Sequence, residues 1–93
     1  MLKVIGVITD VLEVQKISDK FSKLDFVVTD YSGMYPNPML FSLSGERMKA
    51  LEGFSPGAEV SVQFYPRGAY SKLEDNSKPK LFMTLEAVLI KNV

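Results

Sequence analysis

Apolar and polar residues alternate along much of this chain, and a period of two residues predicts strands. Residues 23–31 (KLDFVVTDY), 39–44 (MLFSLS) and 59–65 (EVSVQFY) each place large apolar side chains at every second position. One face of each predicted strand should therefore be buried. The side chains predicted to point inward are Leu24, Phe26, Val28, Met39, Phe41, Leu43, Val60, Val62 and Phe64.

The first and last predicted strands depart from simple alternation. The first, residues 2–14, is long, rich in β-branched residues and interrupted by Gly6. A glycine inside a strand predicts a bulge or a bend, which would let one long strand serve two sheets. The last, residues 80–91 (KLFMTLEAVLIK), has large apolar residues on both faces, so the pattern does not define which face points inward.

Three polar segments separate the predicted strands. Residues 15–22 (QKISDKFS) are predicted to form a loop, and the glycine and prolines of residues 32–39 (SGMYPNPM) predict a turn or loop. Residues 66–79 (PRGAYSKLEDNSKP) form a long polar excursion before the last strand. The pattern leaves two alternatives for this excursion, a β-ribbon arm or a mobile loop.

One short helix is predicted between the third and fourth strands. Ser44 suits the N-cap, Glu46 brings a negative charge to the first turn, and Gly53 suits the position after the last turn. The apolar side chains of this segment are predicted to cover the core, and they are Met48, Leu51 and Phe54.

Five strands with one helix between the third and the fourth is the element order of the OB-fold, a small Greek-key barrel. We therefore predict an all-β protein with small α content, a five-stranded OB-fold barrel that forms a single domain over residues 1–93. In such a barrel the helix closes the bottom, where the strands leave the core uncovered.

The composition removes several kinds of chemistry. The 93 residues include no cysteine and no histidine, so disulfides, thiolate zinc sites and cysteine nucleophiles are excluded, and the commonest general base is missing. The eleven acidic residues are scattered and show no metal-loop spacing. We therefore expect a protein that is not an enzyme, with no cofactor and no metal site.

The N-terminal apolar run is the only candidate for a targeting segment. It is broken by Thr9 and Asp10 and lacks a small-residue cleavage site. No apolar stretch approaches the length of a membrane span. A chain without cysteine fits the cytoplasm, and this is the location we expect.

Residues 24–64 resemble the single-stranded DNA-binding protein superfamily, and more closely a family of short, functionally uncharacterised bacterial and phage OB domains. The shared elements are Asp25-Phe26-Val27, Tyr35-Pro36, the strand end from Phe41 to Gly45, and Gly57 before the fourth strand. The resemblance implies an OB-fold and binding of single-stranded DNA. Relatives often carry a base-stacking aromatic residue immediately before the glycine of the third strand, where this sequence has Ser44.

The formal net charge is zero, whereas proteins that bind through phosphate neutralisation are normally basic. In an OB-fold the ligand crosses the second and third strands, between the loop joining strands one and two and the loop joining strands four and five. The first of these segments, residues 15–23, has three lysines and one aspartate, and the second, residues 67–80, has four basic and two acidic residues. The basic residues predicted to contact nucleic acid are Lys16, Lys20, Lys23, Arg67, Lys72, Lys78 and Lys80.

Exposed aromatic rings are the platforms on which unpaired bases stack. The rings predicted to contact a ligand are those of Phe21, Tyr65 and Tyr70. The rings expected to brace their own loop or to pack inside the barrel are those of Tyr31, Tyr35 and Phe82. Ser42 and Ser44, on the outward side of the third strand, complete the predicted nucleic-acid site, where Ser42 could bond a phosphate or a base edge.

Two functions from different classes fit the sequence. The first is a non-sequence-specific single-stranded DNA-binding protein that acts in replication or recombination or on a mobile element, as a homo-oligomer with a dimer favoured. The second is an OB-fold interaction module or accessory subunit that does not bind nucleic acid. In that case outward apolar residues would form a homo-oligomer interface, among them Leu40, Leu89 and Ile90. A carbohydrate- or small-ligand-binding domain is a third alternative, which only the shared fold suggests.

Overall fold

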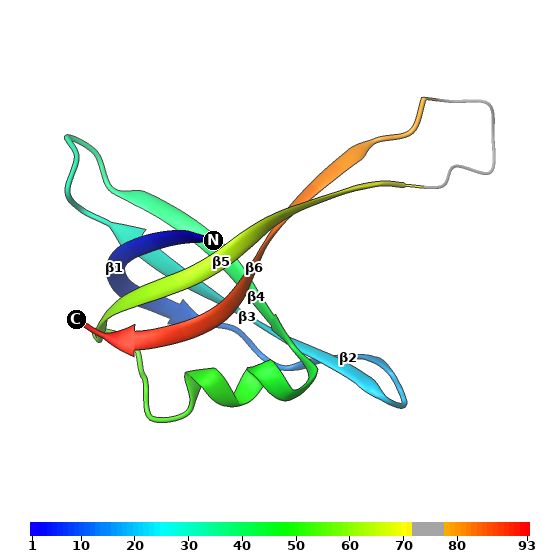
Figure 1. Cartoon of the computed structure of the whole chain (residues 1–93), viewed down its shortest axis with the longest axis horizontal. Coiled ribbons are helices and arrows are strands. Elements are labelled where there is room, and N and C mark those ends of the chain that lie inside the picture. Colours follow the sequence, from blue (N-terminus) through cyan, green and yellow to red (C-terminus); the bar gives the residue numbers. More distant parts are fainter. Residues whose placement is uncertain (72–77) are drawn as a thin grey trace.

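The computed structural model describes residues 1–71 and 78–93. Its helix is a short 3-10 helix, η1, which lies between two strands of the sheet (Figure 1). The elements in chain order are β1 (Leu2–Val11), β2 (Gln15–Ser18), β3 (Phe21–Asp30), β4 (Asn37–Ser44), η1 (Gly45–Leu51), β5 (Glu59–Tyr70) and β6 (Leu81–Asn92).

The strands close into a Greek-key barrel. Their order is β1-β5-β6-β4-β3-β2, and β1 also pairs with β3, which closes the ring of five long strands. All of these pairings are antiparallel except that of β4 with β6. The predicted all-β OB-fold is therefore confirmed, with β1, β3, β4, β5 and β6 as its five barrel strands.

The core consists of the side chains that the alternation placed inside. Seven of the nine predicted inward residues are buried, and the other two, Leu24 and Met39, are half-buried against them. The Phe41 ring lies at the centre, with centroid distances of 5.6 Å to Phe26 and 5.1 Å to Phe64. Aromatic pairs at these distances add to the burial of apolar surface.

Gly6 lies where β1 changes partners. Residues 2–7 of β1 pair with β5, residues 7–11 pair with β3, and Val7 pairs with both. A Cβ atom at Gly6 would lie only 2.6 Å from the carbonyl oxygen of Thr29. The predicted bend at Gly6 is confirmed, while the bulge of β1 lies further on, at Thr9.

A bulge in β6 explains why this strand has apolar residues on both faces. Gln63 pairs with Leu89 and Phe64 pairs with Ala87, so Val88 has no partner on β5. The extra residue exchanges the two faces of the strand. Ala87 is buried on one side of the bulge and Ile90 on the other, so the prediction that Ile90 lies at an interface between copies is wrong.

Helix η1 closes the bottom of the barrel, as predicted. Leu51 is buried, and Met48 and Phe54 pack against the same core. Ser44 occupies the N-cap position with an extended backbone, but its side chain makes no capping hydrogen bond, so that part of the prediction is wrong. Gly53 has φ +84°, as expected for the glycine that follows a helix.

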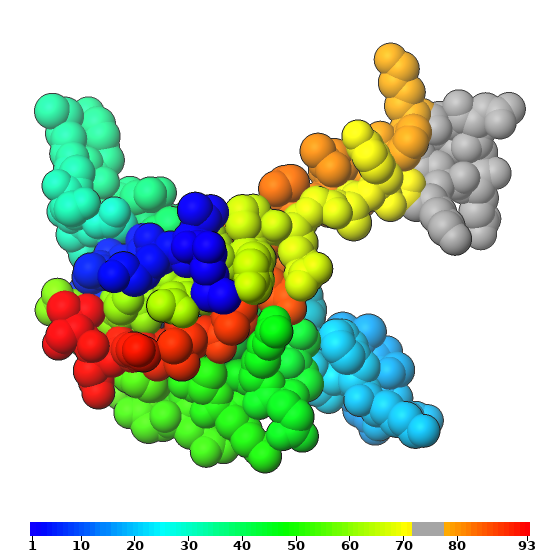
Figure 2. Space-filling view, viewed as in Figure 1, coloured from blue at the N-terminus to red at the C-terminus, as the bar shows by residue number. Residues whose placement is uncertain are grey.

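Three segments project from the barrel (Figures 1 and 2). The first is the hairpin of β2 and β3, where a loop was predicted over residues 15–22. Because both faces of β2 are exposed, no apolar alternation marks it as a strand. The second is the loop of residues 31–36, between β3 and β4.

The third projection, which we call the arm, consists of the end of β5 (residues 66–70), the start of β6 (residues 81–85) and the described residues that follow and precede them, 71 and 78–80. Its strands pair from Pro66 with Leu85 to Tyr70 with Leu81. Of the two alternatives for this segment, the β-ribbon is confirmed in the described residues. Within those residues no helix is long and apolar enough to cross a membrane.

Candidate nucleic-acid interface

The barrel and the arm share one continuous outer face. Residues paired across neighbouring strands point to the same side of a sheet, and successive residues point to opposite sides. Asp25 of β3 pairs with Ser42 of β4, which pairs with Glu86 of β6, which in turn pairs with Tyr65 of β5. Their chain neighbours Phe26, Phe41, Ala87 and Phe64 are buried, so these four side chains lie in one row on the outside.

Hydrogen bonds and charges organise one end of this row. The Ser42 hydroxyl donates to the Asp25 carboxylate at 2.7 Å, and the Lys23 ammonium lies 3.8 Å from the other oxygen of Asp25. Ser42 is therefore already bonded within the protein. The predicted contact of Ser42 with a phosphate or base would have to replace or share this bond.

Two arginines meet at Glu86, between Ser42 and Tyr65 in this row. Arg47 Nη1 donates to Glu86 Oε1 at 2.9 Å, and Arg67 Nε contacts Glu86 Oε2. Arg47 comes from η1 and Arg67 from the arm, so the carboxylate joins two elements that are distant in the sequence. The outer face as described thus has three cations, Lys23, Arg47 and Arg67, and two carboxylates.

The arm extends the outer face with aromatic residues. Tyr65, Arg67 and Ala69 alternate along β5, and Ala69 pairs with Phe82 of β6. The Phe82 side chain is 56% exposed and that of Tyr65 is 40% exposed. Two rings and a guanidinium on one side of a ribbon form the kind of surface on which unpaired bases stack.

The opposite side of the arm, which we call its aliphatic face, is different in character. It carries Gly68, Tyr70, Leu81 and Met83. A Cβ atom at Gly68 would meet the Met83 sulfur at 3.3 Å and the Leu81 side chain at 3.6 Å, which confirms that these side chains share one side. The described part of this face carries no charge, although its side chains are more than half exposed.

The hairpin of β2 and β3 carries the remaining predicted residues of the first loop. Lys16, Lys20 and Phe21 are all exposed. Lys16 Nζ lies 3.9 Å from Asp19 Oδ1, and both side chains are largely exposed to water, where such a pair contributes little to stability. These residues remain accessible to a ligand, but they lie on a projection of their own.

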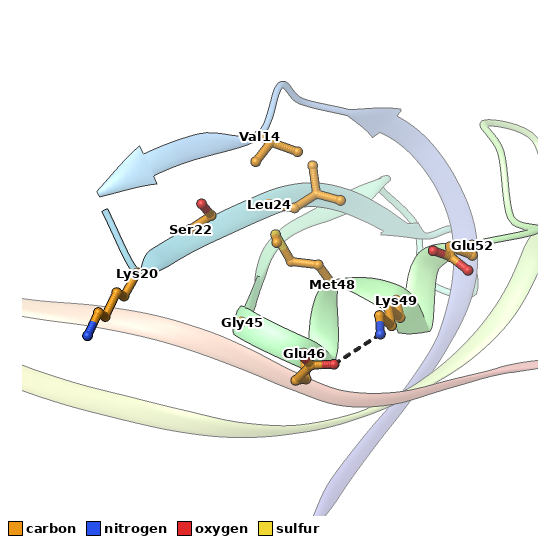
Figure 3. Close-up of a pocket in the computed structure, with 9 residues that line it drawn as sticks. All are labelled: Val14, Lys20, Ser22, Leu24, Gly45, Glu46, Met48, Lys49 and Glu52. Atoms are coloured by element: carbon orange, nitrogen blue, oxygen red, sulfur yellow. Dashed lines mark ion pairs between the residues drawn. The ribbon is translucent and has the colours of Figure 1, made fainter. Parts of the chain in front are cut away.

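A groove of about 590 Å³ lies between this hairpin and η1 (Figure 3). Leu24 and Met48 point toward each other across it, and Glu46 forms an ion pair with Lys49 at its edge, at 3.1 Å. Lys20 and Glu52 complete the charged edge, so its two lysines and two glutamates balance. We therefore do not extend the candidate interface into this groove.

The loop of residues 31–36 begins with a local turn. Hydrogen bonds from Ser32, first from its side chain and then from its backbone, lower the pKa of Asp30. The Ser32 amide donates to Asp30 Oδ1 at 2.9 Å. Tyr31 and Tyr35 are both more than half exposed, and their bracing of this loop stays a prediction.

The structure divides the predicted site residues among several surfaces. The outer face has Lys23, Ser42, Ser44, Tyr65 and Arg67, and Ser44 pairs with Lys23 at the end of β4. The hairpin has Lys16, Lys20 and Phe21. Tyr70 lies on the aliphatic face of the arm, away from Tyr65. Lys78 and Lys80 are exposed before β6, and Lys72 lies outside the described residues.

Sequence reasoning missed three residues of the outer face. The prediction that Phe82 packs inside the barrel is wrong, since Phe82 is exposed. The bulge at Val88 changes which residues of β6 point inward, so simple alternation does not identify the inward face of this strand. Arg47 and Glu86 were not singled out. They are 39 positions apart, and no local pattern signals their ion pair.

In fold, this chain is similar to single-stranded DNA-binding proteins. Two crystal structures of the mitochondrial single-stranded DNA-binding protein Rim1 from S. cerevisiae match it, each covering 99% of this chain and 92% of the other. The TM-scores are 0.71 and 0.70, at sequence identities of 17% and 14%. The resemblance inferred from the sequence is thereby confirmed for the fold.

Residues 3–91 match the family described as Domain of unknown function (DUF3127), and the chain belongs to this family. No curated protein sequence matches it. Among the described residues no group of acidic side chains could hold a metal ion.

Proposed function

We propose that this protein binds single-stranded DNA without sequence specificity, through the outer face. One observation carries the proposal, namely that Tyr65 lies on the outer face of the barrel and that Arg67 and Phe82 continue this face along the arm. The rings offer stacking platforms that any base can use, and the cations offer contacts to phosphate. This chain shares its fold with Rim1, which is described as a single-stranded DNA-binding protein, and this likeness supports the same proposal.

We further propose that the protein is not an enzyme and that it acts in the cytoplasm, on strands exposed during replication or recombination or on a mobile element. The absence of histidine and cysteine from the sequence supports a binding role. A single barrel with few platforms binds a short stretch weakly. A homo-oligomer, with a dimer favoured, would raise the affinity for long strands through effective concentration.

The test is fluorescence anisotropy of a labelled oligo-dT strand, with a DNA duplex as control. We expect saturable binding of the single strand and much weaker binding of the duplex, in which the bases are not free to stack. The outer face as described offers three cations, each beside a carboxylate, so we expect a shallow slope of log K against log salt, no steeper than about −2.1. No binding at tens of micromolar protein in low salt would reject the proposal.

A second candidate function, an interaction module, is favoured by the aliphatic face of the arm. We propose a second copy of this chain as its occupant, because a chain with zero net charge meets no net repulsion from its own copy. The three large side chains of this face could bury roughly 400 Å² per copy, about half of what a stable interface needs. The expected dimer is therefore weak and forms at high concentration or along a DNA strand.

Sedimentation velocity at increasing protein concentration tests this contact. We expect self-association that the double variant Leu81→Ser/Met83→Ser abolishes, because it removes aliphatic area from the arm. Leu40→Ser is the matched control, since Leu40 is similarly exposed but lies on β4, outside the arm. If Leu40→Ser dissociates the dimer and the arm variant does not, the contact lies on the outer face instead.

A further inference from the structure

Glu86 lies at the centre of the outer face. It pairs with Ser42 on one side and with Tyr65 on the other, and its side chain is 20% exposed. A carboxylate at this position repels the phosphates that the proposed function brings to the same surface. It therefore needs an explanation.

Both oxygens of Glu86 are occupied by guanidinium groups. Oε1 accepts a hydrogen bond from Arg47 at 2.9 Å, and Oε2 contacts Arg67. These are two of the three cations of the outer face, and the third, Lys23, lies 3.8 Å from Asp25. Each of these three cations thus has a carboxylate partner within the protein.

A guanidinium group binds carboxylate and phosphate oxygens through the same N–H donors. An Arg67 Nε–H directed at Glu86 is not free for a phosphate. A strand that neutralised both arginines would leave the Glu86 carboxylate without cations, on a surface covered by polyanion. The ion pairs and the proposed phosphate contacts therefore compete.

We infer that Glu86 is an internal competitor for phosphate, which holds Arg47 and Arg67 and thereby limits the affinity of the outer face for single-stranded DNA. The inference rests on the proposed function. It also accounts for a nucleic-acid surface on a chain without net charge, because binding would then depend on base stacking more than on charge. Affinity should be low and salt dependence shallow in the natural protein.

The test is Glu86→Gln, which preserves the shape of the side chain and removes its charge. We expect oligo-dT binding about 5- to 10-fold tighter at about 0.1 M salt, and a salt slope steeper by about 0.7 to 1.4, as one or two further phosphates are neutralised. The slope is decisive, because a merely structural effect on the arm would not add phosphate contacts. In the double variant Glu86→Gln/Arg67→Gln the slope should fall again by about 0.7.

Glu59→Gln is the matched control. It changes the net charge by the same amount at the start of β5, six residues from Tyr65 and so about 20 Å away along the strand. At 0.1 M salt this distance is about twice the Debye length of about 10 Å, so affinities are compared at this concentration. Affinity and salt slope should therefore stay near those of the natural protein.

The outcomes separate the inference from the proposed function. If the natural protein binds oligo-dT and Glu86→Gln binds equally or more weakly, the inference is overturned and Glu86 positions the arginines for binding. If Glu86→Gln binds more tightly than the natural protein, with a steeper slope that Glu59→Gln does not share, the inference is supported. If neither the natural protein nor Glu86→Gln binds, the proposed function and the inference are both rejected.

Discussion

Alanine in place of Gly6 should destabilise the barrel by about 2 kcal/mol. The added Cβ atom would lie 2.6 Å from the Thr29 carbonyl oxygen and 2.8 Å from Val28 Cγ1. Because the first of these atoms belongs to the backbone of β3, the overlap can be relieved only by moving β1 away from β3. Overpacking of this kind costs about 1–3 kcal/mol, although the lower chain entropy of alanine offsets a part.

Urea unfolding followed by circular dichroism measures this effect. A lower midpoint with an unchanged m-value would show a loss of stability without a change in the surface exposed on unfolding. Gly33→Ala is the control, because its Cβ atom would meet nothing closer than 4.0 Å, the Tyr35 carbonyl oxygen. Its midpoint should correspond to a change within about 0.5 kcal/mol. Equal midpoints for the two variants would contradict the close approach of β1 to β3.

The barrel was predictable because most of its strands have one buried and one exposed face. Alternation in β3, β4 and β5 identified the inward side chains, and Gly6 indicated that β1 bends. The same reasoning failed where that condition does not hold. In β2 neither face is buried, and in β6 the bulge at Val88 exchanges the faces partway along the strand.

The candidate interface was predictable only in part, for related reasons. Lys23 and Ser42 lie on strands with clear alternation. Tyr65 and Arg67 also alternate, with Tyr65 in the barrel and Arg67 on the same side of the arm. Tyr70 follows Tyr65 by five positions, an odd number, so the period of two already placed it on the other side of β5. This signal was present in the sequence.

Charge pairing was the part that no local pattern could supply. The contact of Arg47 with Glu86 depends on how η1 lies against β6. Counting charges by segment treated Arg67 as a free cation of a basic loop, whereas the fold pairs it with Glu86. The positive charge available to a ligand is therefore smaller than the sequence indicated. In the proposed binding, the aromatic residues would contribute a larger share of the binding free energy.

Phe82→Ala should weaken binding of oligo-dT about tenfold, and Tyr65→Ala by a similar factor. Each substitution removes a stacking platform from the outer face, and base–aromatic stacking contributes about 1–3 kcal/mol per base. Anisotropy titrations at fixed salt measure the loss. Phe82→Leu should recover little of it, because leucine restores apolar area but has no aromatic face.

Tyr70→Ala is the matched control for these variants. It removes an equally large ring from the same arm, but from the aliphatic face, so affinity for a strand too short to hold two copies should stay within about twofold of the natural value, a change of roughly 0.4 kcal/mol. Salt slopes should be unchanged in all of these variants, since none alters a charge. If Tyr70→Ala weakens binding and Phe82→Ala does not, the strand lies on the aliphatic face, and Arg67 and Glu86 have no part in holding it. A tenfold loss confined to Phe82 and Tyr65 would place the bases on the outer face, beside the arginines that Glu86 holds.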